Sequence, residues 1–373
     1  MGKGNLKEIA KLFFKLGCIS FGGPAAHIAM MEKEIVAKQQ WMDHDHFLDL
    51  VGATNLIPGP NSTEMTMHCG YEQKGLKGLI VAGACFIFPA VVITAAFAWA
   101  YQQYGKLPGV TAFIYGIKPA VIAIIISALI TLGKKALKST TLWILGLATI
   151  TACLLGMNEI AALFLCGFAG MVIYSLKSRS GNNINSFFPL LLLKANVVIK
   201  APAIKIFLSF LKIGALLYGG GYVLFAFLDA ELVRKGLLSR QQLIDAIAVG
   251  QFTPGPVLST ATFIGWQMGG WSGALLATLG IFLPSFVLVG FLNPWVPKLR
   301  KIKILSAFLD AINAASVAVI AAVCVHMSRD AITDWKTSII ALLSLIVLLV
   351  FKKVNSAFIV IGGAAAGYLL TFL

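Results

Sequence analysis

Two helix-breaking motifs each occur twice in the chain, and both could present free backbone amides to an anion. Gly22-Gly23-Pro24 is matched by Gly219-Gly220-Gly221, and Pro58-Gly59-Pro60 is matched by Pro254-Gly255-Pro256. A helix that begins after such a break points unpaired N–H groups and a partial positive charge into the gap, which favours an anion there. A kink that only shapes packing is the alternative interpretation. The glycines predicted to bind substrate are Gly22, Gly23, Gly59, Gly219, Gly220, Gly221 and Gly255.

Neutral hydrogen-bond donors lie beside these breaks, and such donors suit a small oxyanion that must bind and then leave. Asn55 and Gln251 each stand three residues before a Pro-Gly-Pro motif. Lys15 and Lys212 each precede a Gly-Gly pair by seven residues, so they could add positive charge to the site or instead reach the lipid headgroups. A hydroxyl here could also bond back to its own helix. The predicted binding hydroxyls belong to Ser62, Thr63, Thr253, Ser259 and Thr260.

Three carboxylates are candidates for coupling or gating. Glu34 and Glu231 recur at matching positions and could form gating ion pairs, although solvated helix ends would look the same. Glu64 follows the first Pro-Gly-Pro motif inside an apolar segment and has no acidic counterpart. A carboxylate at membrane depth is a functional candidate, here as a carrier of protons. The apolar segments hold no nucleophile–base pair, metal-ligand cluster or cofactor motif, so we expect a protein that is not an enzyme.

These motifs belong to an internal duplication. The run FKLGCISFGGP at 14–24 aligns with LKIGALLYGGG at 211–221, at a displacement of 197 residues. Farther along, Asp49 aligns with Asp245 at a displacement of 196. We predict a first repeat at 1–180, a basic cytoplasmic linker at 181–201 and a second repeat at 202–373.

Composition places both repeats in a membrane. Of the 373 residues, 58% are hydrophobic and 12% are charged, whereas soluble chains average roughly 45–50% apolar and 25% charged. The net charge of +15 could indicate nucleic acid. The bases, however, are spread singly along short gaps between apolar runs of about 17–25 residues, the length of a transmembrane helix. The sequence therefore predicts an all-α polytopic membrane protein, in contact with lipid and not with nucleic acid.

The distribution of Lys and Arg predicts an inverted repeat. The bases concentrate in the gaps at 133–141, 176–205, 293–303 and 351–355, which we therefore assign to the cytoplasm. The apolar segment 78–100 then runs outward and its partner in the second repeat runs inward, an arrangement common in secondary transporters. We expect about ten transmembrane helices plus broken or re-entrant segments. One of the two broken elements in each half should be re-entrant, and the side of the N-terminus stays open.

The runs FGGPAAHIAMMEKEIV and IPGPNS, with their partners YGGGYVLFAFLDAELV and GQFTPGP, resemble the chromate ion transporter family in its long, two-domain form. The resemblance covers nearly the whole chain. It implies a multi-pass secondary transporter that exports chromate, a tetrahedral dianion shaped like sulfate, across the inner membrane of a bacterium. The second copy reads YGGG where the first reads FGGP, which argues against two symmetric sites.

We therefore expect chromate or a similar oxyanion to bind at half-helix N-termini near the membrane midplane. Sulfate or another oxyanion is the alternative substrate, and an anion channel is the alternative mechanism. The chain has no P-loop of its own, so transport would draw on ion gradients or on a partner. A homodimer and a monomer are both compatible with the sequence.

Overall fold

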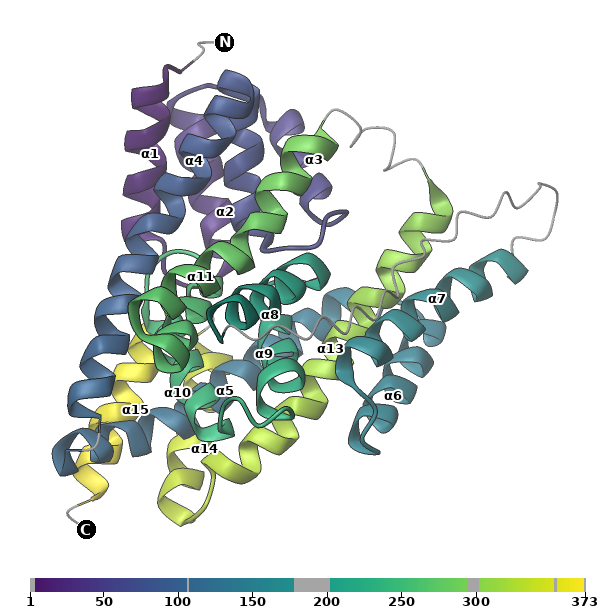
Figure 1. Ribbon diagram of the computed structural model, residues 1–373. Coiled ribbons are helices and arrows are strands. Elements are labelled where there is room, and N and C mark those ends of the chain that lie inside the picture. The colour runs from purple at the N-terminus through teal and green to yellow at the C-terminus, as the bar shows by residue number, and fades with distance from the viewer. Residues whose placement is uncertain (1–3, 106, 178–201, 294–301, 352–353, 372–373) are drawn as a thin grey trace.

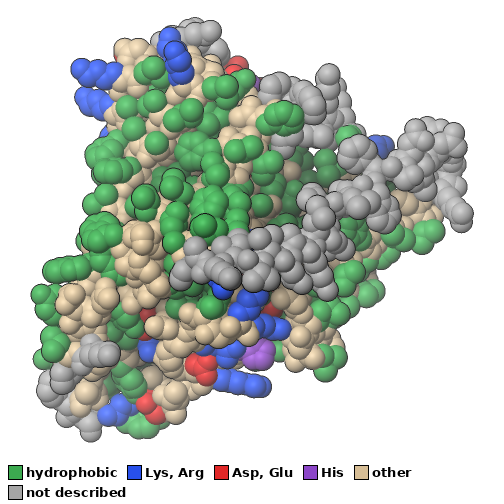
Figure 2. Space-filling view, viewed as in Figure 1, with side chains coloured by type: hydrophobic (Ala, Val, Ile, Leu, Met, Phe, Trp, Pro, Cys, Tyr) green, Lys and Arg blue, Asp and Glu red, His purple; other side chains and the backbone are tan. Residues whose placement is uncertain are grey.

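Every regular element in the part of the chain that the structure describes is a helix (Figure 1). The computed structural model describes residues 4–105, 107–177, 202–293, 302–351 and 354–371. Five of its helices are long and apolar enough to cross a membrane, and three shorter helices are apolar as well. Hydrophobic side chains cover the middle of the face drawn in Figure 2, and Lys and Arg gather toward its two ends. The chain is therefore a multi-pass membrane protein.

The two repeats match helix for helix, apart from one short 3₁₀ turn that, among the described residues, is present only in the second. The first contains α1 (Leu6–Ile19), α2 (Pro24–Glu32), the π-helical turn η1 (Lys33–Lys38), α3 (His44–Thr54), α4 (Asn61–Tyr104), α5 (Pro108–Ala136), α6 (Thr140–Leu154) and α7 (Glu159–Lys177). The second contains α8 (Pro202–Leu216), α9 (Val223–Leu228), η2 (Asp229–Val233), α10 (Arg240–Phe252), η3 (Val257–Ser259), α11 (Thr260–Leu292), α13 (Lys303–Ala331), α14 (Trp335–Val350) and α15 (Ser356–Leu370).

The duplication extends to single backbone angles. Gly75 in α4 has φ 58° and ψ −146°, and Gly270 in α11 has φ 60° and ψ −145°. Glycine adopts this left-handed region without a Cβ penalty, so the chain reverses there. In α4 the two arms pack so closely that a side chain at Gly70 would overlap the carbonyl of Gly78. Each of these long helices is thus a short arm, a tight turn and a long arm.

Both broken elements of the first repeat enter and leave at the same end of the molecule. The Gly4 N–H donates to Gln73 Oε1 at 3.0 Å, and Gln73 Nε2 donates to the carbonyl of Trp41 at 3.3 Å, which gathers the outer ends of these segments. Their tips lie in the interior, where Ser20 is buried and the loop after α3 contacts the second repeat. The expectation that only one element is re-entrant is therefore wrong, because the glycine turn sends the short arm of α4 back out.

The repeats run in opposite directions. A side chain on Gly83 of α4 would meet Phe286 of α11, and a side chain on Gly290 of α11 would lie 3.3 Å from Leu76 of α4. Because residue numbers rise on one helix as they fall on the other, the long arms are antiparallel. We call the end where α1 begins and α5 finishes the basic end, after Lys7, Lys11, Lys134, Lys135 and Lys138, and the other the opposite end.

The described ends of the predicted linker lie at opposite ends of the molecule. α7 runs antiparallel to α13, since Gly167 packs on Ile312 and Gly170 on Ala311, so α7 finishes at the basic end. The first turns of α8 contact Gly269 through Ile206, at the opposite end. The linker predicted at 181–201 lies outside the described residues. The prediction that the whole gap 176–205 lies on the cytoplasmic side does not agree with the positions of the two helices that flank it.

Candidate functional site

A cavity of about 550 Å³ lies between the two repeats. It is lined by the start of α2, the end of α3, the C-terminal half of α5, the turn before α9 and the middle of α13. The last turn of α5 and the first residue of α15 also line it, so it opens at the basic end. Its polar lining residues are Thr54, Asn55, Asn61, Ser127, Thr131, Lys135, Tyr222, Asn313, Ser316 and Ser356.

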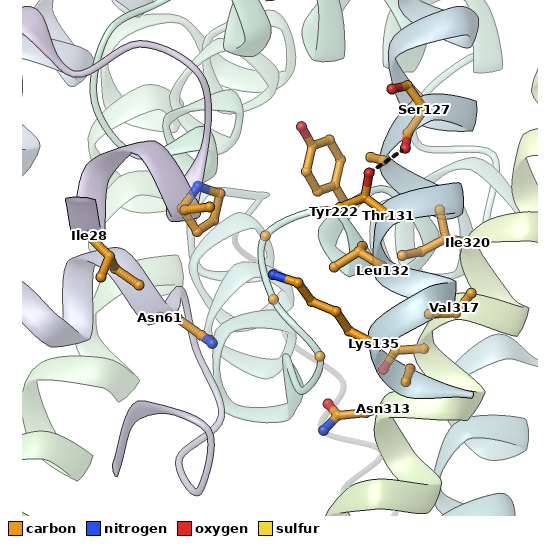
Figure 3. A pocket seen from close by; sticks show the side chains of 18 of the residues that line it. Ile28, Asn61, Ser127, Thr131, Leu132, Lys135, Tyr222, Asn313, Val317 and Ile320 are labelled. Carbon is orange, nitrogen blue, oxygen red and sulfur yellow. Dashed lines mark hydrogen bonds between the residues drawn. The ribbon is translucent and has the colours of Figure 1, made fainter. Parts of the chain in front are cut away.

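Lys135 gives this cavity its charge. It is the one charged side chain among the lining residues that the structure describes, and none of them is a carboxylate. A lysine in the last turn of a helix also stabilises the helix dipole, which alone could explain its position. Figure 3 nevertheless shows its side chain extending into the cavity, toward the glycine turn before Tyr222 and toward Asn61. The arrangement offers one positive charge and several neutral donors to an anion.

The Gly-Gly tips and Asn55, which the sequence predicts to bind substrate, line the cavity. Gly22 and Gly219–Gly221 belong to its wall, while a side chain on Gly23 would face the Tyr222 hydroxyl at 3.7 Å. Asn61 Nδ2 donates to Asn55 Oδ1 at 2.9 Å, so the two side-chain amides lie next to each other in the cavity wall. Asn61 is also the first residue of α4, whose N-terminus therefore points partial positive charge toward the cavity.

The Pro-Gly-Pro motifs occupy a different position, because their amides join the two repeats. The Gly59 N–H donates to the carbonyl of Leu217, and the Gly255 N–H donates to the carbonyl of Ser20, each at 2.7 Å. Both bonds run from one repeat to the residue that follows the first helix of the other. These two amides are consumed in holding the tips together, so they are not free to bind an anion in this conformation.

The hydroxyls predicted to bind substrate are buried near these two hydrogen bonds between the repeats, and they do not line the cavity. Thr253 donates to the carbonyl of Val249 at 2.7 Å, and Thr260 donates to that of Val257 at 2.8 Å, so both bond back locally. Ser62 lies 3.2 Å from the ring of His27. Thr63, Ser259 and Gln251 are buried as well. Their role in binding stays a prediction.

Lys15 and Lys212 are engaged with the predicted gating carboxylates. Lys15 lies 3.1 Å from Glu34, and Lys212 lies 2.5 Å from Glu231, so the pair recurs in both repeats. Lys38 also donates to Glu34, and this hydrogen bond holds the pKa of Glu34 below its ordinary value. None of these residues lines the cavity. Within each pair the lysine and the glutamate neutralise each other's charge, beside the broken elements.

Glu64 lies against Gly59 of the first Pro-Gly-Pro motif and is fully buried. Its Oε1 accepts a hydrogen bond from Ser285 of the second repeat at 3.4 Å, and a side chain on Gly59 would overlap that same oxygen. Among the described residues, no lysine or arginine forms an ion pair with it.

At the opposite end a second cavity of about 350 Å³ is lined by acidic as well as basic groups, Asp245, Asp330 and Lys118 among them. Sequence reasoning did not select Lys135, Asn61, Tyr222 or Asn313. Alignment of the two repeats does offer a signal for Lys135. This residue aligns with Asp330 at a displacement of 195, so the charge at this position has opposite signs in the two halves.

Comparison with known proteins gives consistent matches over nearly the whole chain. The model of the chromate transporter family matches residues 7–171 and again residues 204–368. The chromate transport protein of Cupriavidus metallidurans is 30% identical, over 97% of this chain and 92% of that protein. A probable chromate transport protein of Synechococcus elongatus is 31% identical, over 97% and 95%. An uncharacterized transporter of Methanocaldococcus jannaschii is 27% identical, over 96% and 92%. No solved structure matches.

Proposed function

The chain belongs to the chromate transporter family, and we propose that it exports chromate or a similar tetrahedral oxyanion from the bacterial cytoplasm across the inner membrane. The observation that carries this proposal is the cavity between the repeats. Its lining joins one lysine to a set of neutral donors and, among the described residues, includes no carboxylate. An acidic lining would repel a dianion, whereas this one attracts it.

In this proposal the anion binds where the two repeats meet. Lys135 supplies a charged hydrogen bond, and Asn61, Asn313 and Tyr222 supply neutral ones. The four oxygens of a tetrahedral oxyanion accept hydrogen bonds from several directions, which fits donors contributed by α4, α5, α13 and the turn before α9. A single lysine leaves part of the dianion charge uncompensated, so the anion can leave again.

The basic end faces the cytoplasm in this proposal, in keeping with its lysines. The cavity then opens inward, and chromate enters it from the cytoplasm. Moving one charge across 100 mV is worth roughly 2.3 kcal/mol, so a dianion that leaves a negative interior gains about 4.6 kcal/mol. That free energy supports an outward gradient of about a thousandfold. Export therefore needs no ATP.

A carrier agrees with the structure better than a channel does. The cavity between the repeats opens at the basic end and does not extend through the opposite end, where side-chain contacts join α10 to α4, α5 and α13. A channel would need both ends open at once.

The proposal is tested by anion flux into everted membrane vesicles, compared for chromate, sulfate and molybdate. We expect saturable chromate uptake that increases when the vesicle interior is made positive, because the dianion follows the potential. Vesicles from cells without the protein provide the control. Flux that does not saturate would indicate a channel, a preference for sulfate would identify that substrate instead, and no flux of any of the three would contradict the proposal.

We further propose that Glu64 couples transport to protons. A carboxylate that is buried without a cation is stable chiefly in its neutral form, so it must bind a proton in this conformation. It lies against Gly59, whose amide holds the tip of α8. A change in its protonation would therefore act on the contact between the repeats.

The Glu64→Gln variant separates this role from packing, because Gln has the shape of the protonated side chain. We expect it to keep chromate flux driven by membrane potential and to lose the response of flux to an imposed pH gradient. Proteoliposomes with independently set potential and pH measure both. Glu64→Ala is the packing control and should lower the yield of folded protein. An unchanged pH-gradient response in Glu64→Gln would place the proton site elsewhere.

A further inference from the structure

The second cavity, at the opposite end, is built on the same two aligned positions as the cavity between the repeats. Lys135 and Asn313 line the cavity between the repeats. At a displacement of 195 residues they align with Asp330 and Lys118, which line the second cavity. The inverted repeat therefore gives each cavity one lysine, from the last turn of α5 at the basic end and from nearer the start of α5 at the opposite end.

Lys118 has hydrogen-bond donors left for a ligand. It is the one cation among the lining residues of the second cavity that the structure describes, and its side chain is 20% exposed. The ammonium donates to the side chain of Gln241. Its distance to Asp245 Oδ1 is 3.7 Å, which is longer than a direct hydrogen bond. Because an ammonium has three N–H donors, this arrangement leaves Lys118 able to bind a further acceptor.

Asp245 would compete with such an acceptor. The Tyr101 hydroxyl donates to its Oδ2 at 2.6 Å, whereas its buried Oδ1 has no hydrogen-bond partner in the part of the chain that the structure describes. The nearby Lys118 ammonium is therefore what compensates the charge on Oδ1. An anion that approached Lys118 would have to share the ammonium with this carboxylate.

The remaining carboxylate in the lining carries less weight. Asp330 lies 3.3 Å from the Arg240 guanidinium, which offsets its charge. The lining of the second cavity is thus one lysine opposed by one uncompensated carboxylate, whereas the described lining of the first cavity holds a lysine and no carboxylate. This difference makes the second cavity the weaker of the two for a dianion.

We propose that the second cavity is a low-affinity oxyanion site, in which Lys118 binds the anion and Asp245 competes with it for the ammonium. The ligand is a tetrahedral oxyanion dianion, the same class that the proposed function assigns to the first cavity. This inference rests on the proposed function for the identity of that class. In an export cycle the second cavity lies at the end where the anion leaves, and weak binding there favours its release.

Protection of a thiol from labelling tests this site without any transport measurement. The reporter is Ile114→Cys, at a position that lines the second cavity, in a background free of the six native cysteines. Purified protein in detergent is labelled with N-ethylmaleimide, which is uncharged, so that a bound anion slows the reaction by occupying space. Molybdate is the probe, because chromate oxidises thiols. Chloride at the same ionic strength corrects for screening.

Loss of the ammonium should weaken protection. With Lys118 present, we expect molybdate at ten times its dissociation constant to slow labelling of Ile114→Cys about tenfold. Lys118→Gln should raise the half-protective molybdate concentration about tenfold or more, since a charged hydrogen bond becomes a neutral one. Lys118→Arg should stay close to the parent. Lys134→Gln, at an exposed site elsewhere on α5, is the control for general surface charge.

Removal of the competitor should strengthen protection. We expect Asp245→Asn to lower the half-protective concentration about tenfold, because the ammonium no longer faces a carboxylate. Adding Lys118→Gln should cancel this gain. The double variant removes both charges of the buried pair, so it still reports if Lys118→Gln alone does not fold. Asp330→Asn should have a smaller effect than Asp245→Asn.

Two results would overturn the second site: no protection of Ile114→Cys by molybdate even in Asp245→Asn, or equal protection in Asp245→Asn with and without Lys118→Gln. The fate of the proposed function is read separately. Saturable flux in vesicles together with an unprotected Ile114→Cys would remove the second site and leave the proposed function standing. Protection that depends on Lys118, without flux of any oxyanion, would keep the site and contradict the proposed function.

Discussion

Replacing Lys135 with Gln is expected to raise the chromate concentration for half-maximal flux about ten- to hundredfold, because a charged hydrogen bond to the anion becomes a neutral one. The side chain stays similar in length, so the cavity keeps its shape. Lys135→Arg retains the charge, so the chromate concentration for half-maximal flux should rise much less. Initial rates of chromate uptake into everted vesicles, measured over a range of concentrations, give the constant directly.

Lys134→Gln is the matched control for this prediction. Lys134 is the preceding residue of α5, it carries the same charge, and its side chain is not part of the cavity lining. Loss of general surface attraction for anions would affect both variants equally, whereas a specific contact would affect Lys135→Gln alone. Equal constants for the two variants would show that Lys135 does not contact the anion.

The pair of lysines also shows what the sequence could not decide. Lys134 and Lys135 both end an apolar span and both look like interfacial bases. Which of them reaches the cavity depends on the rotation of α5 about its axis, and this is fixed by distant contacts such as the packing of Gly116 against Gly363. Tertiary contacts of this kind leave no local pattern in the residues.

Local chemistry, by contrast, predicted the architecture well. Glycine and proline breaks, read against apolar runs, located the broken elements near Gly22 and Gly59, and the repeated motifs predicted an internal duplication. The family model confirms the duplication by matching twice. The number of re-entrant elements was wrong because Gly75 falls within an otherwise continuous helical pattern, and one left-handed glycine was enough to reverse the chain.

The two types of break could not be told apart from sequence for a related reason. Both motifs interrupt a helix, and both leave amides that need partners. At Gly59 and Gly255 the partner is a carbonyl in the other repeat, at Leu217 and Ser20 respectively. Only the inverted packing of the two halves brings these atoms together.

The contacts predict a larger loss of stability from a substitution at Gly59 than from one at Gly255. A Cβ there would overlap both Glu64 Oε1 and Ser285 Oγ, and φ at this residue is +147°. At Gly255 the Cβ would lie 3.0 Å from Ala90, a milder conflict. We expect Gly59→Ala to lower the free energy of unfolding by about 2–4 kcal/mol, from backbone strain together with overpacking.

Gly220→Ala isolates the backbone strain, because φ is +94° at Gly220 and nothing lies within 4 Å of the position its Cβ would take. The expected order of destabilisation is therefore Gly59→Ala, then Gly255→Ala, then Gly220→Ala, as measured by thermal unfolding of purified protein in detergent. Glu64→Ala should partly rescue Gly59→Ala, since it removes one of the two groups that the new methyl meets. Two results would contradict this prediction: a Gly220→Ala variant as unstable as Gly59→Ala, or no rescue by Glu64→Ala. Either result would show that the contact between the two repeats does not depend on close packing at Gly59. The coupling assigned to Glu64 would then lose its structural basis.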